Sequence, residues 1–406
     1  MSEQLNRHFC GILTAAGALV QRCGLAAVLA ACIIASAGAR AEDALSIATW
    51  GGAYGQSQEI AYFEPFAKET GTKIATEIYD GTLARIKEMI GGDESEVDVV
   101  DVSAATLGIL CNDGLLEPID ASILGAAPGG ESAAEDYYSG GLSSCGVASV
   151  AWSTAIAFDR QAFSKNQPSE IAALLDTRRF PGKRSLPDAA RYTLELALLA
   201  DGVDPANVYA ELATSAGVDH AFQALDKIKG DIFWWDNAQE PITWLLEKKV
   251  VMAAGYSGRI FRAAVGDRQR VGVMWDGQIY DLDLWAIPKG AKNKDGAKRF
   301  IIFATDPARL AAQSQLIAYG PMRKSALSLV GKHPVIDVEM KEFLPTAPDN
   351  FKKALKFDDA WWTAHNDDLQ KRFEQWRGPL SPGQGKPPIE AKVQAEPSPG
   401  ATQALP

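Results

Sequence analysis

Two charged residues of this 406-residue sequence could together hold a small ion that carries both a positive and a negative group. Asp283 lies between Leu282 and Leu284 in a β-rich run, where a carboxylate is hard to explain as core and could pair with an ammonium group. Arg259 directly follows the run 256–258, and its planar guanidinium could clamp a carboxylate through two parallel hydrogen bonds. An acid and an arginine at opposite ends of one site would suit an amino acid or an ω-amino acid.

A glycine-rich segment offers a second way to receive an anion. Residues 51–55 read Gly-Gly-Ala-Tyr-Gly and lie between an expected strand and an expected helix. Bare backbone N–H groups at a helix start can bind a carboxylate, so Gly51 and Gly52 are candidate ligand contacts. The alternative is that the glycines only allow the chain to reverse direction. The sequence leaves both interpretations open.

Composition argues against several other classes of function. The chain has 40 Lys and Arg against 51 Asp and Glu, a net charge of −11, and it has no basic run of the kind that binds nucleic acid. No HExxH, P-loop or GxGxxG motif is present, and residues 255–258 fall one residue short of a GxSxG nucleophile elbow. We therefore expect no enzyme activity, no cofactor and no metal. An exported hydrolase of small esters or amides is the competing hypothesis, and an inert surface scaffold is a third.

Tyr137 and Tyr138 raise one metal-binding alternative, because paired tyrosines are found in ferric-ion binders. This pair lies in a Gly- and Ser-rich stretch at 125–141, which we expect to be a surface loop away from the site. The histidines beyond the N-terminal segment, His220, His333 and His365, are scattered and predict no metal site.

The N-terminal segment, residues 1–41, is predicted to be a signal peptide that directs the protein to the periplasm. An apolar run of about 15 residues follows Arg22, which is short for a membrane span and typical of a signal-peptide core. Small residues at 39 and 41 favour cleavage before Glu42. The alternative is lipoprotein anchoring at Cys32, which ends a Leu-Ala-Ala-Cys sequence but is followed by two isoleucines where a polar tether is usual.

Two cysteines, Cys111 and Cys145, remain after removal of residues 1–41, and in an exported protein they most simply form a disulfide. The closed loop of about 35 residues would contribute roughly 4 kcal/mol in the chain-entropy account. Two free buried thiols are the alternative. The mature chain has 37 basic and 50 acidic residues, so its net charge is −13.

The hydrophobic pattern predicts an α/β fold. From residue 45, short β-rich runs alternate with amphipathic helical stretches, an order typical of a mostly parallel sheet covered by helices on both faces. The expected strands and helices of this first part are Leu45–Trp50, Gln56–Glu69, Thr72–Tyr79, Leu83–Ile90 and Val97–Val102.

Two longer β-rich runs predict passages between two domains. Val147–Phe158 and Gln278–Pro288 are about twice the length of a usual strand, and α/β material of its own lies between them. The sequence turns helical after residue 288. Residues 379–406 hold seven Pro and three Gly and are predicted to be a disordered tail.

Several sequence blocks resemble one protein family. The blocks are LSIATWGGAY at 45–54, FAKETG at 66–71, VDVV at 97–100, GLLEPID at 114–120, DLWAIP at 283–288, AKNKDGA at 291–297 and IAYGP at 317–321. In this order and spacing they are similar to the spermidine/putrescine-type periplasmic solute-binding proteins of bacterial ABC importers, which belong to the extracellular solute-binding protein family. The resemblance covers about residues 45–356.

The resemblance implies a two-lobe, type II periplasmic-binding-protein fold, each lobe a mostly parallel sheet flanked by helices, with two hinge crossings. Lobe 1 would comprise 42–148 and 285–330, and lobe 2 would comprise 149–284 and 331–378. A monomer of this kind would trap a small amine between its lobes and deliver it to the transmembrane subunits of an ABC permease.

The resemblance also assigns site residues. It implies that Trp50, Tyr54, Ser103, Tyr256 and Tyr319 line the cleft and that Asp283 pairs with an ammonium group. For each aromatic residue the alternative is ordinary core packing.

This chain departs from the family pattern where acids are expected. Gly51 and Gly52 replace one acid, and Ala189 and Tyr192 stand where two others are placed, so Tyr192 is a further candidate contact. Only one recognised ammonium partner remains, and a triamine would have unpaired charges in a partly desolvated site. Asp80, Asp101, Asp236 and Asp281 could substitute, but the sequence does not place them. The predicted ligand is a polyamine-like cationic or zwitterionic amine, with an amino acid or ω-amino acid as the alternative.

Overall fold

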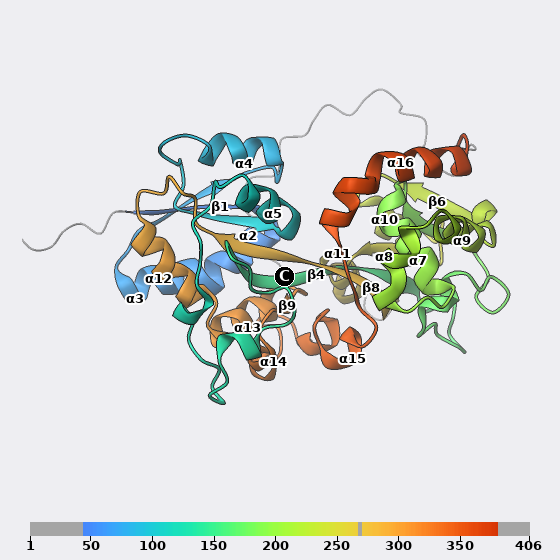
Figure 1. Cartoon of the computed structure of the whole chain (residues 1–406). Helices are drawn as coiled ribbons and strands as arrows, with labels where there is room; N and C mark the ends of the chain where they lie inside the picture. The colour runs from blue at the N-terminus through green and yellow to red at the C-terminus, as the bar shows by residue number, and fades with distance from the viewer. Residues whose placement is uncertain (1–43, 267–269, 381–406) are drawn as a thin grey trace, which may run out of the picture.

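A single mixed sheet runs through the protein in the computed structural model, which describes residues 44–266 and 270–380. In the described residues the sheet has ten strands, with the order β2-β1-β3-β8-β4-β7-β5-β6, and β9 and β10 pair with β4 and β8 (Figure 1). Helices flank the sheet. The predicted signal peptide, the alternative anchor Cys32 and nearly all of the predicted tail lie outside the described residues.

Both ends of the sheet are parallel, as the alternating pattern predicted. β1 (Leu45–Thr49) pairs in parallel with β2 (Ile74–Ile78) and β3 (Val99–Ser103). At the other end, β5 (Arg184–Pro187) pairs in parallel with β6 (Ile232–Trp235) and β7 (Met252–Tyr256). The two long strands between them, β4 (Val147–Asp159) and β8 (Val271–Ala286), are antiparallel to each other and to β7 and β3 respectively.

The helices that cover the sheet follow the expected order. In the first part of the chain they are α2 (Gly52–Gln58), a π-helical turn (Glu59–Phe63), α3 (Glu64–Thr70), α4 (Leu83–Ile90), α5 (Ala104–Asn112) and α6 (Ala133–Asp136). In the middle they are α7 (Ala190–Ala200), α8 (Val208–Leu212), α9 (Ser215–Asp226), α10 (Glu240–Leu246) and α11 (Ser257–Gly266). In the last part they are α12 (Lys294–Ala304), α13 (Pro307–Leu316), α14 (Lys324–Leu329), α15 (Pro348–Phe351) and α16 (Asp359–Arg377).

The hydrophobic side chains divide into cores on either side of the sheet centre, and β4 and β8 contribute to both. Val147 and Ala148 of β4 lie in the core of the first half, whereas Ile156 and Phe158 lie in that of the second. Figure 1 shows two halves joined through these strands. The two long β-rich runs are therefore the crossings that the sequence predicted.

A third passage between the halves was not predicted. Met340 and Leu344 pack in the core of the first half, although residues 331–378 were expected in the second lobe. Leu355 and Phe357 pack in the core of the second half. Between the two cores the chain forms the short strand β10 (Leu355–Lys356), which pairs with β8. A two-residue strand is too short to give a period-2 signal, so the sequence pattern did not reveal it.

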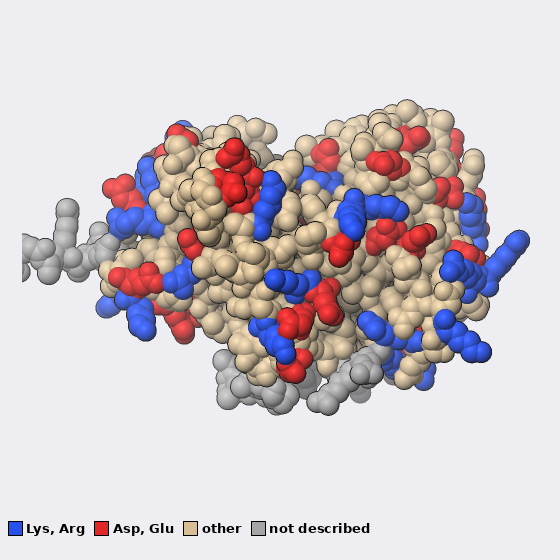
Figure 2. Space-filling model, turned by 90° about the horizontal axis from the view of Figure 1, so that it is seen from below, with Lys and Arg blue, Asp and Glu red and all other residues tan. Residues whose placement is uncertain are grey.

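The two halves also touch at one edge. The N-terminal half of α16 approaches α5 across the space above β4 and β8 (Figure 1). Seen from below, the surface is notched between the halves, and acidic and basic side chains are interspersed on this face (Figure 2). The predicted disulfide is present: Cys111 at the end of α5 is joined to Cys145, with 5.9 Å between their Cα atoms. Within the described ranges, no helix combines the length and apolar character needed to span a bilayer.

Candidate functional site

Strand register places several predicted and unpredicted polar side chains on one face of the central sheet. Ser103 on β3 is directly opposite Asp283 on β8, and Asp101 is opposite Trp285. On the other side of β8, Trp152 of β4 is opposite Asp281. Residues directly opposite each other, and those two apart along a strand, share a face, so Asp101, Asp281 and Asp283 all project the same way.

A β-bulge lies beside Asp283. Ala148 is opposite Leu284 and Val150 is opposite Asp283, so Ser149 is an extra residue in β4. Its hydroxyl donates a hydrogen bond to the backbone oxygen of Asp283 at 3.2 Å. Bulges of this kind redirect side chains next to functional sites.

Asp283 is a buried acid, and no basic side chain among the described residues pairs with it. The residue is only 6% exposed. Burial raises its pKa well above the usual range, and the neighbouring carboxyls of Asp101 and Asp281 raise it further. The Trp152 side chain donates a hydrogen bond to it and opposes this shift. A carboxyl in such a position is ready to accept a cation, because burial disfavours its ionised form until a positive charge pairs with it.

Asp101 is a second buried acid, which the sequence named as a possible substitute but could not place. It is fully buried, and burial raises its pKa to about 7. Gln58 donates a hydrogen bond from Nε2 to one carboxyl oxygen at 2.5 Å, and the other oxygen has no hydrogen-bond partner. Helix α2 positions Gln58 and Tyr54, four residues apart, over this part of β3.

Aromatic rings lie beside the two acids in the first half of the protein. The Tyr54 ring contacts the Tyr319 ring at 5.7 Å between centroids, and the Trp50 ring contacts the Tyr79 ring at 5.4 Å. The buried Trp50 Nε1 and Tyr54 hydroxyl make no hydrogen bond of ordinary geometry. Gly81 leaves room for Trp50, since a Cβ there would lie 2.3 Å from the indole ring.

Tyr319 lies within reach of both an acid and a base. Burial and Asp283 raise the pKa of Tyr319, whereas Arg259 lowers it. Arg259 likewise opposes the rise in the pKa of Tyr256 that burial causes. Among the described residues, no carboxylate forms an ion pair with Arg259. The Tyr256 ring also contacts the Trp152 ring, at 5.5 Å between centroids, so aromatic side chains run from the acidic end to Arg259.

Tyr192 lies within the electrostatic influence of Asp281 and of Tyr256. Its ring stacks on Phe357 with centroids 4.5 Å apart, and its pKa is raised by burial and by Asp281. Its φ of 66° is unusual for a residue with a side chain, and such strain is frequent at functional sites. Asp281 has a pKa of about 7, raised by burial and by Asp359 at the start of α16.

Backbone conformation explains why two glycines follow β1. Gly51 and Gly52 have φ values of 70° and 60°, in the left-handed region that side chains disfavour. No side chain caps the helix that starts at Gly52. The geometry favours the interpretation of this segment as a chain reversal, and it adds no evidence for an anion at these N–H groups.

Several other candidates from the sequence lie outside this cluster or have partners. Asp80 is exposed and accepts hydrogen bonds from Thr82, which lower its pKa. The Tyr137 ring packs under buried Arg323, and in the described part of the chain no group of His, Cys, Asp and Glu could hold a metal ion. The Ser257 hydroxyl accepts a hydrogen bond from the backbone N–H of Ser153 and donates one to the backbone oxygen of Ala318, and no side-chain base among the described residues is bonded to it.

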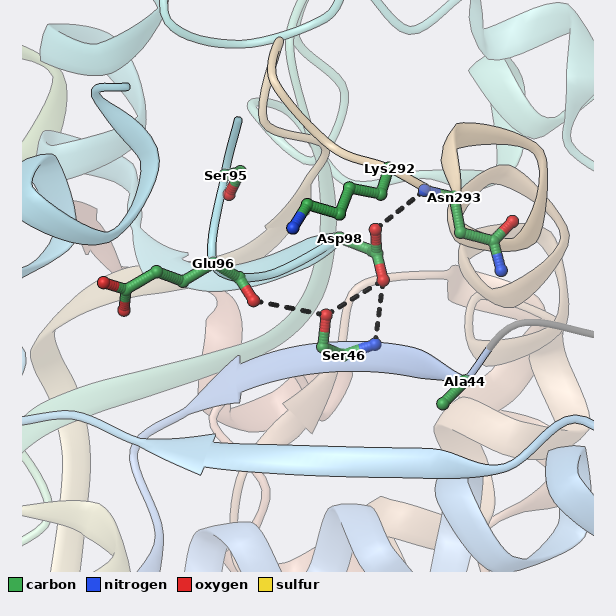
Figure 3. A pocket seen from close by; sticks show the side chains of 7 residues that line it. All are labelled: Ala44, Ser46, Ser95, Glu96, Asp98, Lys292 and Asn293. Atoms are coloured by element: carbon green, nitrogen blue, oxygen red, sulfur yellow. Dashed lines mark hydrogen bonds between the residues drawn. The ribbon is translucent and has the colours of Figure 1, made fainter. Parts of the chain in front are cut away.

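Two hollows on the surface of the described residues lie away from the predicted site residues. One, of about 360 Å³, is lined by residues near the start of β1 and the turn before α12 (Figure 3). There Asp98 accepts hydrogen bonds from the backbone N–H and hydroxyl of Ser46 and from the backbone N–H of Asn293. This carboxylate is satisfied and ties three segments together. The other, of about 550 Å³, lies beside α3 and α13.

The comparisons with known proteins agree on one family. A model of bacterial extracellular solute-binding proteins matches residues 61–341. A gamma-aminobutyric acid (GABA)-binding protein of Pseudomonas aeruginosa is 37% identical over 342 residues, which cover 84% of this chain and 93% of the relative. A spermidine/putrescine-binding periplasmic protein 1 of Haemophilus influenzae is 23% identical over 388 residues, covering 91% of this chain and 98% of the relative.

Solved structures agree with the architecture. A GABA receptor aligns with a TM-score of 0.66 and 27% identity, over 83% of this chain and 98% of that one. The type II fold expected from the sequence blocks is therefore confirmed.

Proposed function

The chain belongs to the bacterial extracellular solute-binding protein family, and on that premise we propose that it captures a zwitterionic ω-amino acid such as GABA between its two halves. As a substrate-binding component of an ABC transporter, it delivers a small solute to membrane permease components. Export through the predicted signal peptide at 1–41 is part of the proposal.

One observation carries the choice of ligand class: the Tyr319 phenol lies within electrostatic reach of Asp283 and of Arg259. The acid lacks a basic partner, and the arginine lacks an acidic one among the described residues. A ligand with an ammonium group at one end and a carboxylate at the other would satisfy both, and the aromatic rings between them would contact its methylene groups.

A polyamine fits this arrangement less well. Its second ammonium group would approach the guanidinium of Arg259, and like charges in a desolvated site are costly. The relative at 37% identity is named for GABA, whereas the spermidine/putrescine relative is only 23% identical. The polyamine-like ligand, which the sequence resemblance put first, thus gives way to the amino-acid alternative.

The mechanism is a shift between open and closed states. Trp50, Tyr54 and Asp101 belong to the first half, and Tyr256 to the second, so a ligand that touches both sets favours closure by its differential affinity. We propose lobe boundaries of 44–148 with 285–354, and 149–284 with 355–378. Hinge motion would then bend β4, β8 and the 355–358 segment.

Isothermal titration with GABA, putrescine and butyrate tests the ligand class. The wild-type protein should bind GABA more tightly than either analogue, because each analogue lacks one of the two charge-assisted contacts. Arg259→Ala should weaken GABA binding by about tenfold or more and putrescine binding much less. Arg178→Ala is the matched control and should change neither, because Arg178 is exposed and is not among the groups that act on Tyr319. Equal losses for GABA and putrescine in Arg259→Ala would refute the zwitterion proposal.

A further inference from the structure

We propose that Asp101 and Asp283 together form the seat for the ligand's ammonium group, and that this pair holds one proton when empty and releases it when the ammonium binds. The inference rests on the proposed function and adds to it a specificity-determining residue, Asp101, and a proton that leaves on binding.

The sheet geometry brings the two acids together. Asp283 is directly opposite Ser103, and Asp101 lies two residues before Ser103 on the same strand, so the two carboxyls are diagonal neighbours on one face. Diagonal positions in an antiparallel pair are roughly 7–8 Å apart at the backbone, within reach of one ammonium group between the side chains. An ammonium group has three N–H donors and can bond both acids at once.

Buried polar side chains converge on this acid pair. The Tyr54 hydroxyl and the Trp50 Nε1 make no hydrogen bond of ordinary geometry, and both act on Asp101 and lower its pKa. Tyr54 is only 8% exposed, and its hydroxyl lies beside Asp101 within the electrostatic influence of Asp283. These donors are neutral, so a bound ammonium group would supply the positive charge that the described part of the site does not offer to the two carboxyls.

In the part of the chain that the structure describes, no base acts on either carboxyl of the pair. From α2 and the π-helical turn, Tyr54, Gln58 and Tyr62 face Asp101, and Tyr79 donates a hydrogen bond to its backbone oxygen. Around Asp283 the charged or polar groups on the packed elements are Asp281 of β8, Trp152 of β4 and Tyr319 after α13. Lys, Arg and His are absent from the groups that act on either carboxyl.

Proton balance follows from this composition. Two like charges in a desolvated site cannot both persist without a cation, so above the pKa of Asp101, which is about 7, the empty pair still keeps one proton and a single negative charge. An arriving ammonium group neutralises the second charge, and the carboxyl proton leaves to solvent. The ligand keeps its own three protons. Affinity should therefore rise with pH above neutrality, by up to about tenfold per pH unit where the empty pair still holds that proton.

Titration calorimetry in buffers of different ionisation enthalpy measures the protons released per ligand bound. With GABA at pH 8, the wild-type protein should release close to one proton, and butyrate, which lacks the ammonium group, should release none. Asp101→Asn should reduce the release and the pH dependence of affinity while GABA still binds, because Asp283 then lacks the neighbouring charge that helps it to keep its proton. Asp98→Asn is the matched control, because this buried acid lies at the other end of β3 with its hydrogen bonds satisfied. It should release the same proton as wild type.

The outcomes distinguish a failure of the Asp101–Asp283 proposal from a failure of the proposed function. Tight GABA binding with no proton release in the wild type, or with unchanged release in Asp101→Asn, would overturn the shared-proton seat and leave the proposed function standing. No binding of GABA by a folded wild-type protein would overturn both. Infrared difference spectra of the empty protein give a ligand-independent measurement: a protonated carboxyl band at pH 6 should weaken in Asp101→Asn. An unchanged band would also refute the pairing.

Discussion

Replacing Asp283 by asparagine should weaken ligand binding and at the same time stabilise the empty protein. Loss of a hydrogen bond to a charged group costs about 1.5–3 kcal/mol, which corresponds to about a 10- to 150-fold loss of affinity for GABA. An amide of the same shape keeps the side-chain volume, so packing against Trp152 and Tyr319 is preserved. The affinity loss would then report charge rather than a cavity.

The stability effect has the opposite sign because Asp283 is an acid with a raised pKa. The folded state holds its proton at pH values where the unfolded chain has lost it, so the free energy of unfolding falls as pH rises between the unfolded and folded pKa values. The neighbouring Asp101 sets the scale: a pKa of about 7, against roughly 4 in an unfolded chain, corresponds to about 4 kcal/mol at pH 8. Asp283→Asn removes the loss of stability at high pH that ionisation of Asp283 itself causes.

The assay is urea unfolding at pH 5 and pH 8, combined with titration of GABA at pH 8. We expect Asp283→Asn to be more stable than wild type at pH 8, with a smaller difference at pH 5, and to bind GABA at least tenfold more weakly. Asp98→Asn should behave in the reverse way, losing stability while keeping affinity, since its carboxylate is satisfied by Ser46 and Asn293. A destabilised Asp283→Asn with normal affinity would show that Asp283 is structural and refute the reasoning.

Two further predictions concern stability away from the site. Cys111→Ser with Cys145→Ser should lower the free energy of unfolding by about 4 kcal/mol in denaturant titrations, because the loop of 34 residues is no longer closed, and added reductant should not lower it further. Arg323→Met should cost about 3–5 kcal/mol in the same titrations because it leaves buried Asp136 without its ion-pair partner. Adding Asp136→Asn should recover part of that loss, and no recovery would exclude an uncompensated charge as the cause.

Sequence periodicity was sufficient for the architecture because each local pattern agreed with the fold. The helix predicted at Leu83–Ile90 has those bounds in the structure, and the strand predicted at Leu45–Trp50 ends one residue earlier, at Thr49. The run predicted at Gln278–Pro288 does form a strand, but this strand, β8, begins earlier in the sequence, at Val271. An irregularity in the β4–β8 pairing between residues 154 and 156 interrupts the ladder there, and no sequence signal marks it.

The candidate site was only partly predictable, because strand register decides which acids meet. Asp283 was found through its apolar neighbours and the family blocks. Asp101 lies in a short strand with alternating apolar and polar residues. The alternation predicts which face of the sheet Asp101 lies on, but it does not predict which residue of the neighbouring strand lies opposite. Trp152 could have been suggested, because it lies on a predicted crossing strand in alternation with small residues, but its position opposite Asp281 required the pairing with β8.

The cost of the acids links stability to function. A site optimised for stability alone would contain apolar side chains, since Asp101 and Asp283, which are buried and have no base beside them among the described residues, lower the stability of the folded protein at neutral pH. An ammonium ligand would offset that cost by completing hydrogen bonds that the empty protein lacks. When pH rises without a ligand, Asp101 and Asp283 lose their shared proton and repel each other within the closed arrangement. The open state, in which water can reach both carboxyls, should then gain population, so that vacant protein at alkaline pH is the form most available to capture the next solute molecule.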